Sequence, residues 1–167
     1  MARPNGKRAI KAGSIRFKDP ATASWVDISP FVTNVTMNVS GWQTARDDVL
    51  DGPLLGVGPR GEDSVTVTGI YTIGETANPQ GDWYKIVWAA FKQADCKNLP
   101  VEISDLSAAT CDPAGAQPFD AADPYWYTTE SFSRVTSATP PEMTRSGATS
   151  KTVQFTVSTE LIDQKDV

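Results

Sequence analysis

The chain has 167 residues, of which 40% are hydrophobic and 21% are charged, and its formal net charge is −5. This composition is ordinary for a single folded domain and excludes a disordered chain. No apolar run approaches the roughly 20 residues that a membrane helix needs, and the basic N-terminus lacks the apolar segment of a secretory signal. We therefore expect synthesis in the cytoplasm and no membrane partner.

The chain contains no histidine, which removes the commonest general base and the usual metal ligand. Its two cysteines, Cys96 and Cys111, form no CxxC pair and cannot complete a zinc site. A disulfide between them stays open, although two free thiols fit a cytoplasmic origin better. We expect no catalytic residue, no metal site and no cofactor.

The N-terminal arm, residues 1–12, is strongly basic. Six basic residues and no acidic one precede Asp19, whereas the rest of the chain carries nine basic residues against twenty acidic ones. The arm could dock on the acidic body of another copy and give head-to-tail self-association. A solvated, disordered tail is an equally good interpretation. Nucleic-acid binding is disfavoured because no aromatic side chain lies among the basic residues to stack on bases.

Alternation of apolar and polar residues predicts a mainly β chain that forms a single domain, 1–167. The segments 13–17 and 24–28 flank a turn signal and predict a first hairpin. Further strands are predicted at 31–40, 64–73, 99–104, 125–136 and 150–160. Segment 41–62 is rich in Gly and Pro and predicts a long irregular loop, and 105–124 predicts a surface insert.

One amphipathic helix is predicted at about 80–95, flanking the sheet. Its apolar residues fall on a single stripe with helical spacing, which is typical of a helix that covers a sheet. The residues expected in the core are Trp83, Ile86, Val87, Ala90 and Phe91. Tyr84 and Trp88 lie outside this stripe, so they either widen the buried face or meet a neighbouring subunit.

Segment 41–62 is more apolar than a purely solvated connection. Its large apolar residues are Trp42, Leu50, Leu54, Leu55 and Val57. A loop of this length in a small domain is usually functional or disordered. Either it packs on its own domain as an Ω-loop, or it docks on an adjacent subunit.

The polar faces of the long strands carry Thr, Asn, Gln and Ser but very few charges. The candidates for a functional surface are Asn34, Thr36, Asn38, Thr152, Gln154 and Thr156. Such a face is either the ordinary solvent side of a sandwich or a wet surface of low charge along which another molecule slides. The two-residue period defines two faces per strand without showing which one is functional.

Acidic and aromatic groupings offer weaker alternatives. The acidic ones are Asp47/Asp48, Glu62/Asp63 and the trio Asp112, Asp120 and Asp123. The adjacent carboxylates show no environment that would tune them for glycoside hydrolysis, and the trio matches no calcium loop. Five tryptophans and the aromatic cluster at 125–127 leave a carbohydrate-binding or adhesion module as the alternative from another functional class.

The order of strand VTVTGIYT at 65–72, an Asn-Pro turn, helix WYKIVWAAFKQ and strand LPVEIS at 99–104 resembles the major tail tube proteins of long-tailed bacteriophages with non-contractile tails. The resemblance covers about 30–104 and the closing strand, and it rests on element order. It implies a β-sandwich or barrel with one flanking helix. It also implies hexameric rings that stack into a hollow tube, through which DNA reaches the host without covalent chemistry.

The resemblance further implies that the 41–62 loop makes ring-to-ring contacts and that the polar strand faces line the lumen. Few cations are expected there, because each phosphate contact adds affinity and would slow the DNA. The implied partners are copies of the chain, other tail proteins (tape measure, terminator and baseplate or tip) and DNA in transit, and the implied location is the virion tail. A tail terminator or a capsid-decoration protein is the alternative within the same structural class.

Overall fold

The structure is a computed structural model of the chain. It describes residues 13–50, 52–73, 79–93, 97–104, 119, 121, 124–141 and 151–165, without the side chains at 44, 45, 47–49, 53–55, 57–59, 79 and 80. The expectations for the arm 1–12, for both cysteines and for Asp112, Asp120 and Asp123 lie outside the described residues. Nearly all of the insert 105–124 lies outside them as well.

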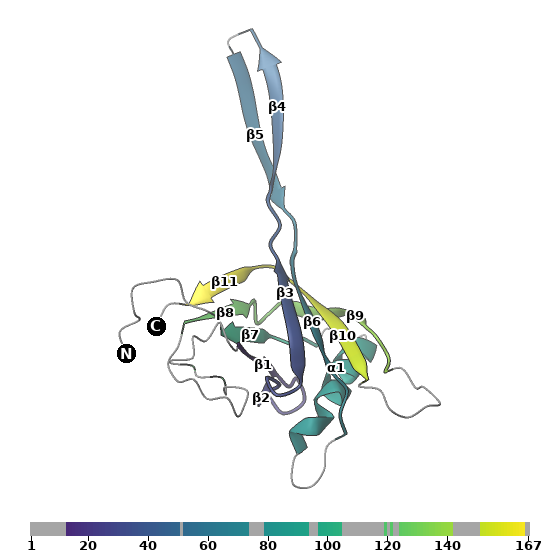
Figure 1. Cartoon of the computed structure of the whole chain (residues 1–167). Helices are drawn as coiled ribbons and strands as arrows, with labels where there is room; N and C mark the ends of the chain where they lie inside the picture. Colours follow the sequence, from purple (N-terminus) through teal and green to yellow (C-terminus); the bar gives the residue numbers. More distant parts are fainter. Residues whose placement is uncertain are drawn as a thin grey trace.

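Two antiparallel sheets form the body of the molecule (Figure 1). The larger sheet has the strand order β11-β8-β7-β1-β2 and the smaller one has the order β3-β6-β10-β9. The strands of the larger sheet are β1 Ser14–Lys18, β2 Trp25–Asp27, β7 Val101–Ser104, β8 Tyr125–Thr128 and β11 Ile162–Lys165. Those of the smaller sheet are β3 Val32–Asn38, β6 Asp63–Ile70, β9 Ser133–Ala138 and β10 Thr152–Thr159. The predicted mainly β, sandwich-like fold is confirmed.

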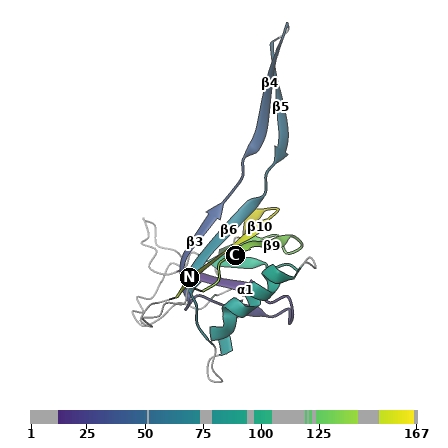
Figure 2. The same ribbon diagram turned by 90° about the vertical axis from the view of Figure 1, so that its right-hand side faces the viewer.

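The segment 41–62 is a β-hairpin, so the prediction of irregular structure there is wrong. Strands β4 (Trp42–Val49) and β5 (Gly52–Arg60) pair antiparallel, from Trp42 opposite Arg60 to Val49 opposite Gly52. This two-stranded hairpin rises from the body as a narrow arm (Figure 2). The strand ladder satisfies the backbone donors and acceptors of a segment that is too rich in Gly and Pro to be recognised by alternation.

Two further strand predictions need correction. The single strand expected at 125–136 is two strands, β8 and β9, which a turn separates; the Phe132 N–H donates to the Thr129 carbonyl in that turn at 3.2 Å. Strand β11 was not predicted from sequence, because its four residues, IDQK, contain only one apolar side chain. The hairpin predicted from 13–17 and 24–28 is confirmed as the antiparallel pair β1 and β2.

Helix α1 (Trp83–Lys92) follows a short 3-10 turn, η1 (Pro79–Asp82), and covers the core beside the smaller sheet. The side chains of Trp83 and Val87 are fully buried, and Ala90 is 6% exposed. The helix ends before residue 95, because Gln93 has an extended backbone.

The buried side of α1 is rotated from the predicted stripe. Tyr84, which was expected outside it, is 2% exposed, whereas Ile86 and Phe91 are only half-buried. Tyr84 is buried because its hydroxyl donates a hydrogen bond to the Thr139 carbonyl just after β9. This bond connects the N-terminal turn of the helix to the segment that follows β9.

The core lies between the sheets and α1. Its fully or almost fully buried side chains come from both sheets and the helix: Ile15, Phe17, Val65, Val67, Trp83, Val87, Val101, Val153, Phe155 and Val157. Trp83 is central. Its ring stacks on Phe31 with centroids 6.4 Å apart, and its indole N–H donates to the Ile70 carbonyl at 3.3 Å. The core therefore fixes one face of the smaller sheet and leaves the other face to interact with partners or solvent.

Candidate assembly surfaces

The six polar residues singled out from sequence all lie on one face of the smaller sheet. Directly paired residues of antiparallel strands point to the same side, so the register shows which side chains are neighbours. The rows across β3, β6 and β10 are Asn34–Thr68–Gln154, Thr36–Thr66–Thr156 and Asn38–Ser64–Ser158. Thr152 extends this face opposite Ile70. We call this surface the polar face.

The polar face is held by contacts between its own hydroxyl groups. Thr66 Oγ1 lies 3.2 Å from Thr156 Oγ1, and Thr136 Oγ1 on β9 lies 3.3 Å from Ser158 Oγ. Such groups both donate and accept, so they exchange partners readily with water or with a passing polar molecule. The polar face can therefore offer many weak hydrogen bonds and no fixed binding geometry.

Charge is almost absent from the polar face. Arg134 on β9 pairs with Ser158 and is the only charged strand residue on this face within the described ranges. Its guanidinium lies 5.5 Å from the centroid of the Phe132 ring. Lys151 precedes the first residue of β10 and is exposed. A polyanion would therefore meet few counter-charges on this surface.

The smaller sheet has two outer strands, β3 and β9, whose outer edges have no partner strand among the described residues. An unpaired strand edge presents backbone N–H and C=O groups that can pair with another chain. The polar side chains of β3 (Asn34, Thr36, Asn38) are exposed at such an edge. The smaller sheet can therefore be extended on either side by copies of itself.

The base of the hairpin is fixed by a buried ion pair. The Arg60 guanidinium donates to both carboxylate oxygens of Asp63, and the backbone N–H groups of Ser40 and Ile162 donate to the same carboxylate at 2.9 and 2.8 Å. Burial opposes ionisation of Asp63, but these donors together hold the pKa of its carboxyl below the usual value. The network joins the hairpin to β6 and to the start of β11.

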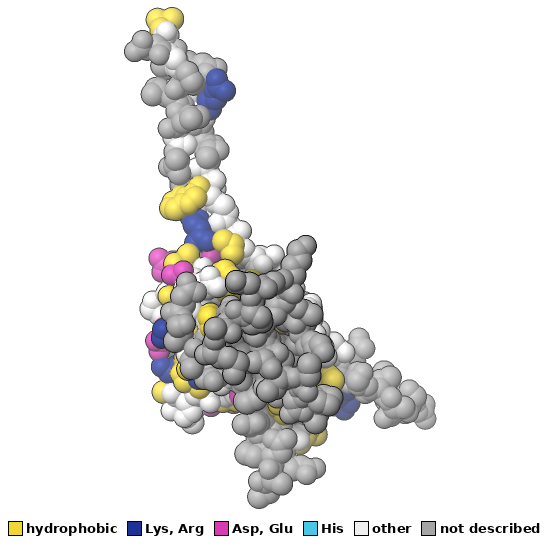
Figure 3. All heavy atoms as spheres, turned by 60° about the vertical axis from the view of Figure 1, so that its left-hand side comes forward, with side chains coloured by type: hydrophobic (Ala, Val, Ile, Leu, Met, Phe, Trp, Pro, Cys, Tyr) yellow, Lys and Arg dark blue, Asp and Glu magenta, His cyan; other side chains and the backbone are white. Residues whose placement is uncertain are grey.

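The apolar residues predicted to make inter-subunit contacts all lie on the hairpin. Trp42, at its base, is 65% exposed and Leu50, at its tip, is fully exposed. Leu54, Leu55 and Val57 lie on β5, but their side chains are outside the described residues. Hydrophobic side chains are visible at the tip and again near the base in Figure 3. Exposed apolar groups on a projecting arm are typical of a surface that is covered in an assembly.

The described part of the chain contains neither a candidate metal site nor a candidate membrane-spanning helix. No group of three or more His, Cys, Asp or Glu residues there could hold a metal ion. No helix among the described residues is long and apolar enough to cross a membrane.

No family model and no curated protein matches the sequence. Solved structures share the fold. A chain of the sheath-tube complex of PVC, an extracellular contractile injection system in its extended state, superposes with a TM-score of 0.64 at 15% identity, covering 98% of this chain and 94% of that one. A chain of the PVC sheath/tube terminator gives 0.62 at 14% identity, covering 96% and 98%. A chain of the tube-terminating cap of the anti-feeding prophage gives 0.62 at 15% identity, covering 100% and 96%.

These likenesses establish the fold, and each superposition covers nearly the whole chain. The solved structures that share the fold belong to contractile injection systems, whereas the sequence resemblance named non-contractile tails. The strand–helix–strand order on which the resemblance rested describes the fold of the subunit. That order of elements gives no information on whether a sheath surrounds the chain.

Proposed function

We propose that the chain is a structural subunit of a phage-tail-like particle, in which copies form rings that stack into a hollow tube. The observation that carries this proposal is the combination of one nearly uncharged polar face with two unpaired edges on the same sheet. An enzyme site would need convergent reactive groups, which this face does not offer. The likeness of fold to chains of tube-containing assemblies supports the same proposal.

Rings form when the β3 edge of one copy pairs with the β9 edge of the next. Repeating one heterologous contact around an axis closes a ring, and closure leaves no sheet edge exposed. The smaller sheets of all copies then become one continuous barrel. Six copies per ring is the number that the family resemblance implies.

The polar face lines the lumen of this barrel. The core side of the same sheet is covered by α1 and the larger sheet, so the polar face is the side free to point inwards. DNA passing through would meet exchangeable hydroxyl and amide groups and very few cations, and it would therefore bind weakly. In this arrangement the tube serves genome delivery from a virion tail.

The hairpin links successive rings. It projects from the edge of the body, and its exposed Trp42 and Leu50 need a covering partner. The Arg60–Asp63 pair fixes the base of the hairpin, so its direction is set before assembly. The remaining partners are other tail proteins at the two ends of the tube.

A shortened hairpin tests this proposal. Replacing residues 47–54 with Asn-Gly closes the hairpin on the paired residues Arg46 and Leu55 and preserves its base. The variant should fold, judged by its circular dichroism and unfolding midpoint, but it should form no stacked tubes in negative-stain electron microscopy. The double change Leu54→Asp and Leu55→Asp keeps the length and should act in the same way. Tubes of normal length from either variant would exclude the hairpin as the inter-ring contact.

A tube terminator is the second candidate, because two of the similar structures are a sheath/tube terminator and a tube-terminating cap. A terminator forms rings but does not stack them without limit. Purified wild-type protein that gives single rings at high concentration would therefore favour the terminator. A monomer that binds a glycan column would instead favour a carbohydrate-binding module.

A further inference from the structure

A pocket of about 350 Å³ lies between α1 and the end of the smaller sheet that is distant from the hairpin. Strand β6 starts at the hairpin base with Asp63 and ends at Ile70, so Tyr71, which lines the pocket, is separated from the hairpin base by the length of that strand. The lining residues are Tyr71, Tyr84, Lys85, Trp88, Ala89, Pro140 and Pro141. In Figure 2, α1 lies low on the body and the hairpin tip lies at the opposite end of the molecule.

The apolar wall of the pocket is rigid. Tyr71 and Tyr84 meet edge to face with their ring centroids 6.1 Å apart. The Tyr84 hydroxyl donates to the Thr139 carbonyl, and the Tyr71 N–H donates to the Lys151 carbonyl at 2.7 Å. A preformed aromatic wall needs little ordering when it binds, so an apolar side chain can enter at low entropic cost.

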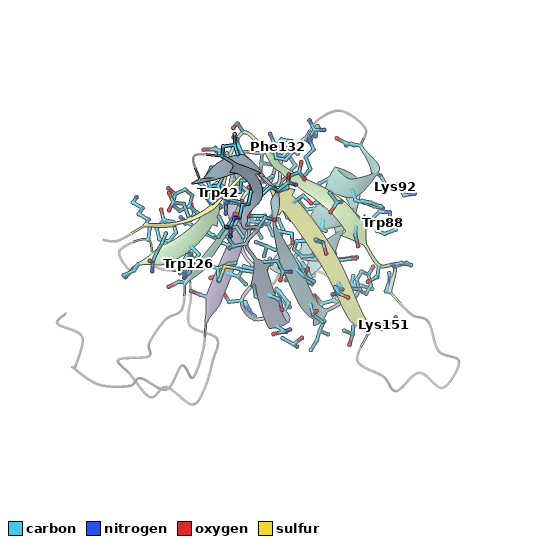
Figure 4. The ribbon with its side chains drawn as sticks, turned by 90° about the horizontal axis from the view of Figure 1, so that it is seen from above. Trp42, Trp88, Lys92, Trp126, Phe132 and Lys151 are labelled. Atoms are coloured by element: carbon cyan, nitrogen blue, oxygen red, sulfur yellow. The ribbon has the colours of Figure 1, made fainter. Side chains whose placement is uncertain are left out.

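One lysine, Lys85, lines the pocket, and two others lie on neighbouring segments. The Lys151 backbone carbonyl accepts the Tyr71 N–H, and the Lys92 ammonium lies 5.4 Å from the centre of the Trp88 ring. Trp88, Lys92 and Lys151 lie along one side of the body (Figure 4). Asp82 forms an ion pair with Lys85 at 3.2 Å and offsets one of these three charges. The pocket therefore combines an apolar interior with one lining lysine, Lys85, and two further lysines on neighbouring segments.

The hairpin tip has the complementary chemistry. Leu50 is fully exposed in the turn that joins β4 to β5. The sequence around it, RDDVLD at 46–51, contains three aspartates against one arginine. An exposed leucine that neighbours three aspartates in the sequence matches an aromatic pocket with lysines at and near it, in both hydrophobicity and charge.

We propose that this pocket receives the hairpin tip of a second copy of the chain, with Leu50 entering between Tyr84 and Trp88. The proposal rests on the proposed tube function and names the receiving surface of its inter-ring contact. Tip and pocket lie at opposite ends of the molecule, so the contact is heterologous and leaves a free tip and a free pocket after each addition. Rings joined in this way can stack without limit in one direction.

Cross-linking between single-cysteine variants tests the contact. Both carry Cys96→Ser and Cys111→Ser; one adds Leu50→Cys at the tip and the other adds Ala89→Cys at the exposed edge of the pocket. A mixture of the two, assembled and treated with a short bismaleimide, should give a covalent dimer. The matched control replaces Ala89→Cys by Lys97→Cys, which is exposed and does not line the pocket, and it should give no dimer.

The outcomes of this experiment distinguish a failure of the pocket assignment from a failure of the proposed tube function. Tubes that form without a 50–89 cross-link would overturn the pocket assignment and leave the tube function standing. A cross-link within the Leu50→Cys variant alone would show tip-to-tip contact and would also overturn it. Wild-type protein that stays monomeric at every concentration would overturn both proposals.

Charge at the rim provides an independent readout. Lys85→Glu should raise the critical concentration for tube growth several-fold, and the difference from wild type should shrink as salt is added. Lys97→Glu makes the same change of charge away from the pocket and should leave the critical concentration unchanged. Equal effects of the two variants would show that only net charge matters and would contradict the assigned contact.

Discussion

Arg60 and Asp63 form a two-pronged ion pair at the point where the hairpin joins the body, with one guanidinium nitrogen 2.9 and 2.8 Å from the two carboxylate oxygens. The Asp63 side chain is fully buried and that of Arg60 is 19% exposed. The same carboxylate accepts backbone N–H groups from Ser40 and Ile162. Asp63, at the start of β6, is thus bonded to Ser40, which lies between β3 and β4, and to Ile162 at the start of β11.

Asp63→Asn should destabilise the monomer by about 3 kcal/mol, the low end for a broken buried ion pair, because Arg60 keeps some contact with solvent. The measurement is urea unfolding below the concentration at which the protein assembles. Glu62→Gln, a change of the neighbouring exposed carboxylate, is the control and should stay within about 0.5 kcal/mol of wild type. Equal effects of the two variants would exclude a structural role for the pair.

Acid should weaken the wild-type protein more than Asp63→Asn. The pKa of Asp63 is lower in the folded protein than in the unfolded chain, where it is about 4, so the unfolded state binds more protons. The stabilisation by this carboxylate is complete above that value and is lost as the pH falls towards and through the folded pKa. The urea midpoints of unfolding of the two proteins should therefore converge as the pH falls below about 4. Parallel midpoint curves over that range would contradict the pKa direction.

Gly69→Ala should destabilise the fold by about 1–3 kcal/mol through overpacking. A Cβ atom at Gly69 would lie 2.8 Å from the Phe31 carbonyl oxygen and 3.2 Å from the Trp83 ring, and neither the backbone nor the buried indole can move freely. Gly41→Ala is the matched control, because its Cβ would have no atom within 4 Å. The check is the difference between the two unfolding free energies, and a stable Gly69→Ala variant would contradict the packing of Trp83.

Trp83→Ala should cost about 3–5 kcal/mol, the range for a large buried aromatic side chain. Phe91→Ala should cost clearly less, because Phe91 is only half-buried and packs beside Trp88, with ring centroids 5.7 Å apart. Chemical denaturation of both variants measures the order. A larger loss of unfolding free energy for Phe91→Ala than for Trp83→Ala would support the helix orientation expected from the apolar stripe alone.

Sequence alone predicted the elements whose side-chain period is undisturbed. The strands predicted at 64–73 and 150–160 are found as β6 and β10, and their alternating residues Val65, Val67, Val153 and Phe155 lie in the core. The hairpin was missed because its strands lack alternation, although Asp51-Gly52 is a dipeptide favoured in tight hairpin turns. That signal could have found it.

The polar face was predictable as a set of residues but not as one surface. Period two places Asn34 and Thr36 on the same side of β3, yet only the register shows that they continue through β6 to Gln154 and Thr156. The Arg60–Asp63 pair and the aromatic pocket depend on contacts between distant segments. Local patterns contain no information about such contacts.

Lysine introduced on the polar face should slow DNA passage. Thr36→Lys combined with Gln154→Lys adds two charges at exposed positions and should preserve folding and tube formation. Particles with the double variant should eject DNA more slowly than wild type, and the difference should be greatest at low salt. Thr36→Ser combined with Gln154→Asn, which adds no charge at the same two positions, is the matched control and should eject DNA at the wild-type rate. Ejection at the wild-type rate by the lysine variant would exclude this face from the lumen.

The most direct measurement is a cryo-electron microscopy reconstruction of the purified, assembled chain. The expected result is a stack of rings in which β3 of each copy pairs with β9 of the next. Asn34, Thr36, Thr66, Gln154 and Thr156 should line a lumen in which Arg134 is the only charged strand residue of the described ranges. A tube whose lumen is ringed by Lys and Arg residues other than Arg134 would contradict the proposed role of the polar face. A monomer at every concentration would contradict the tube itself.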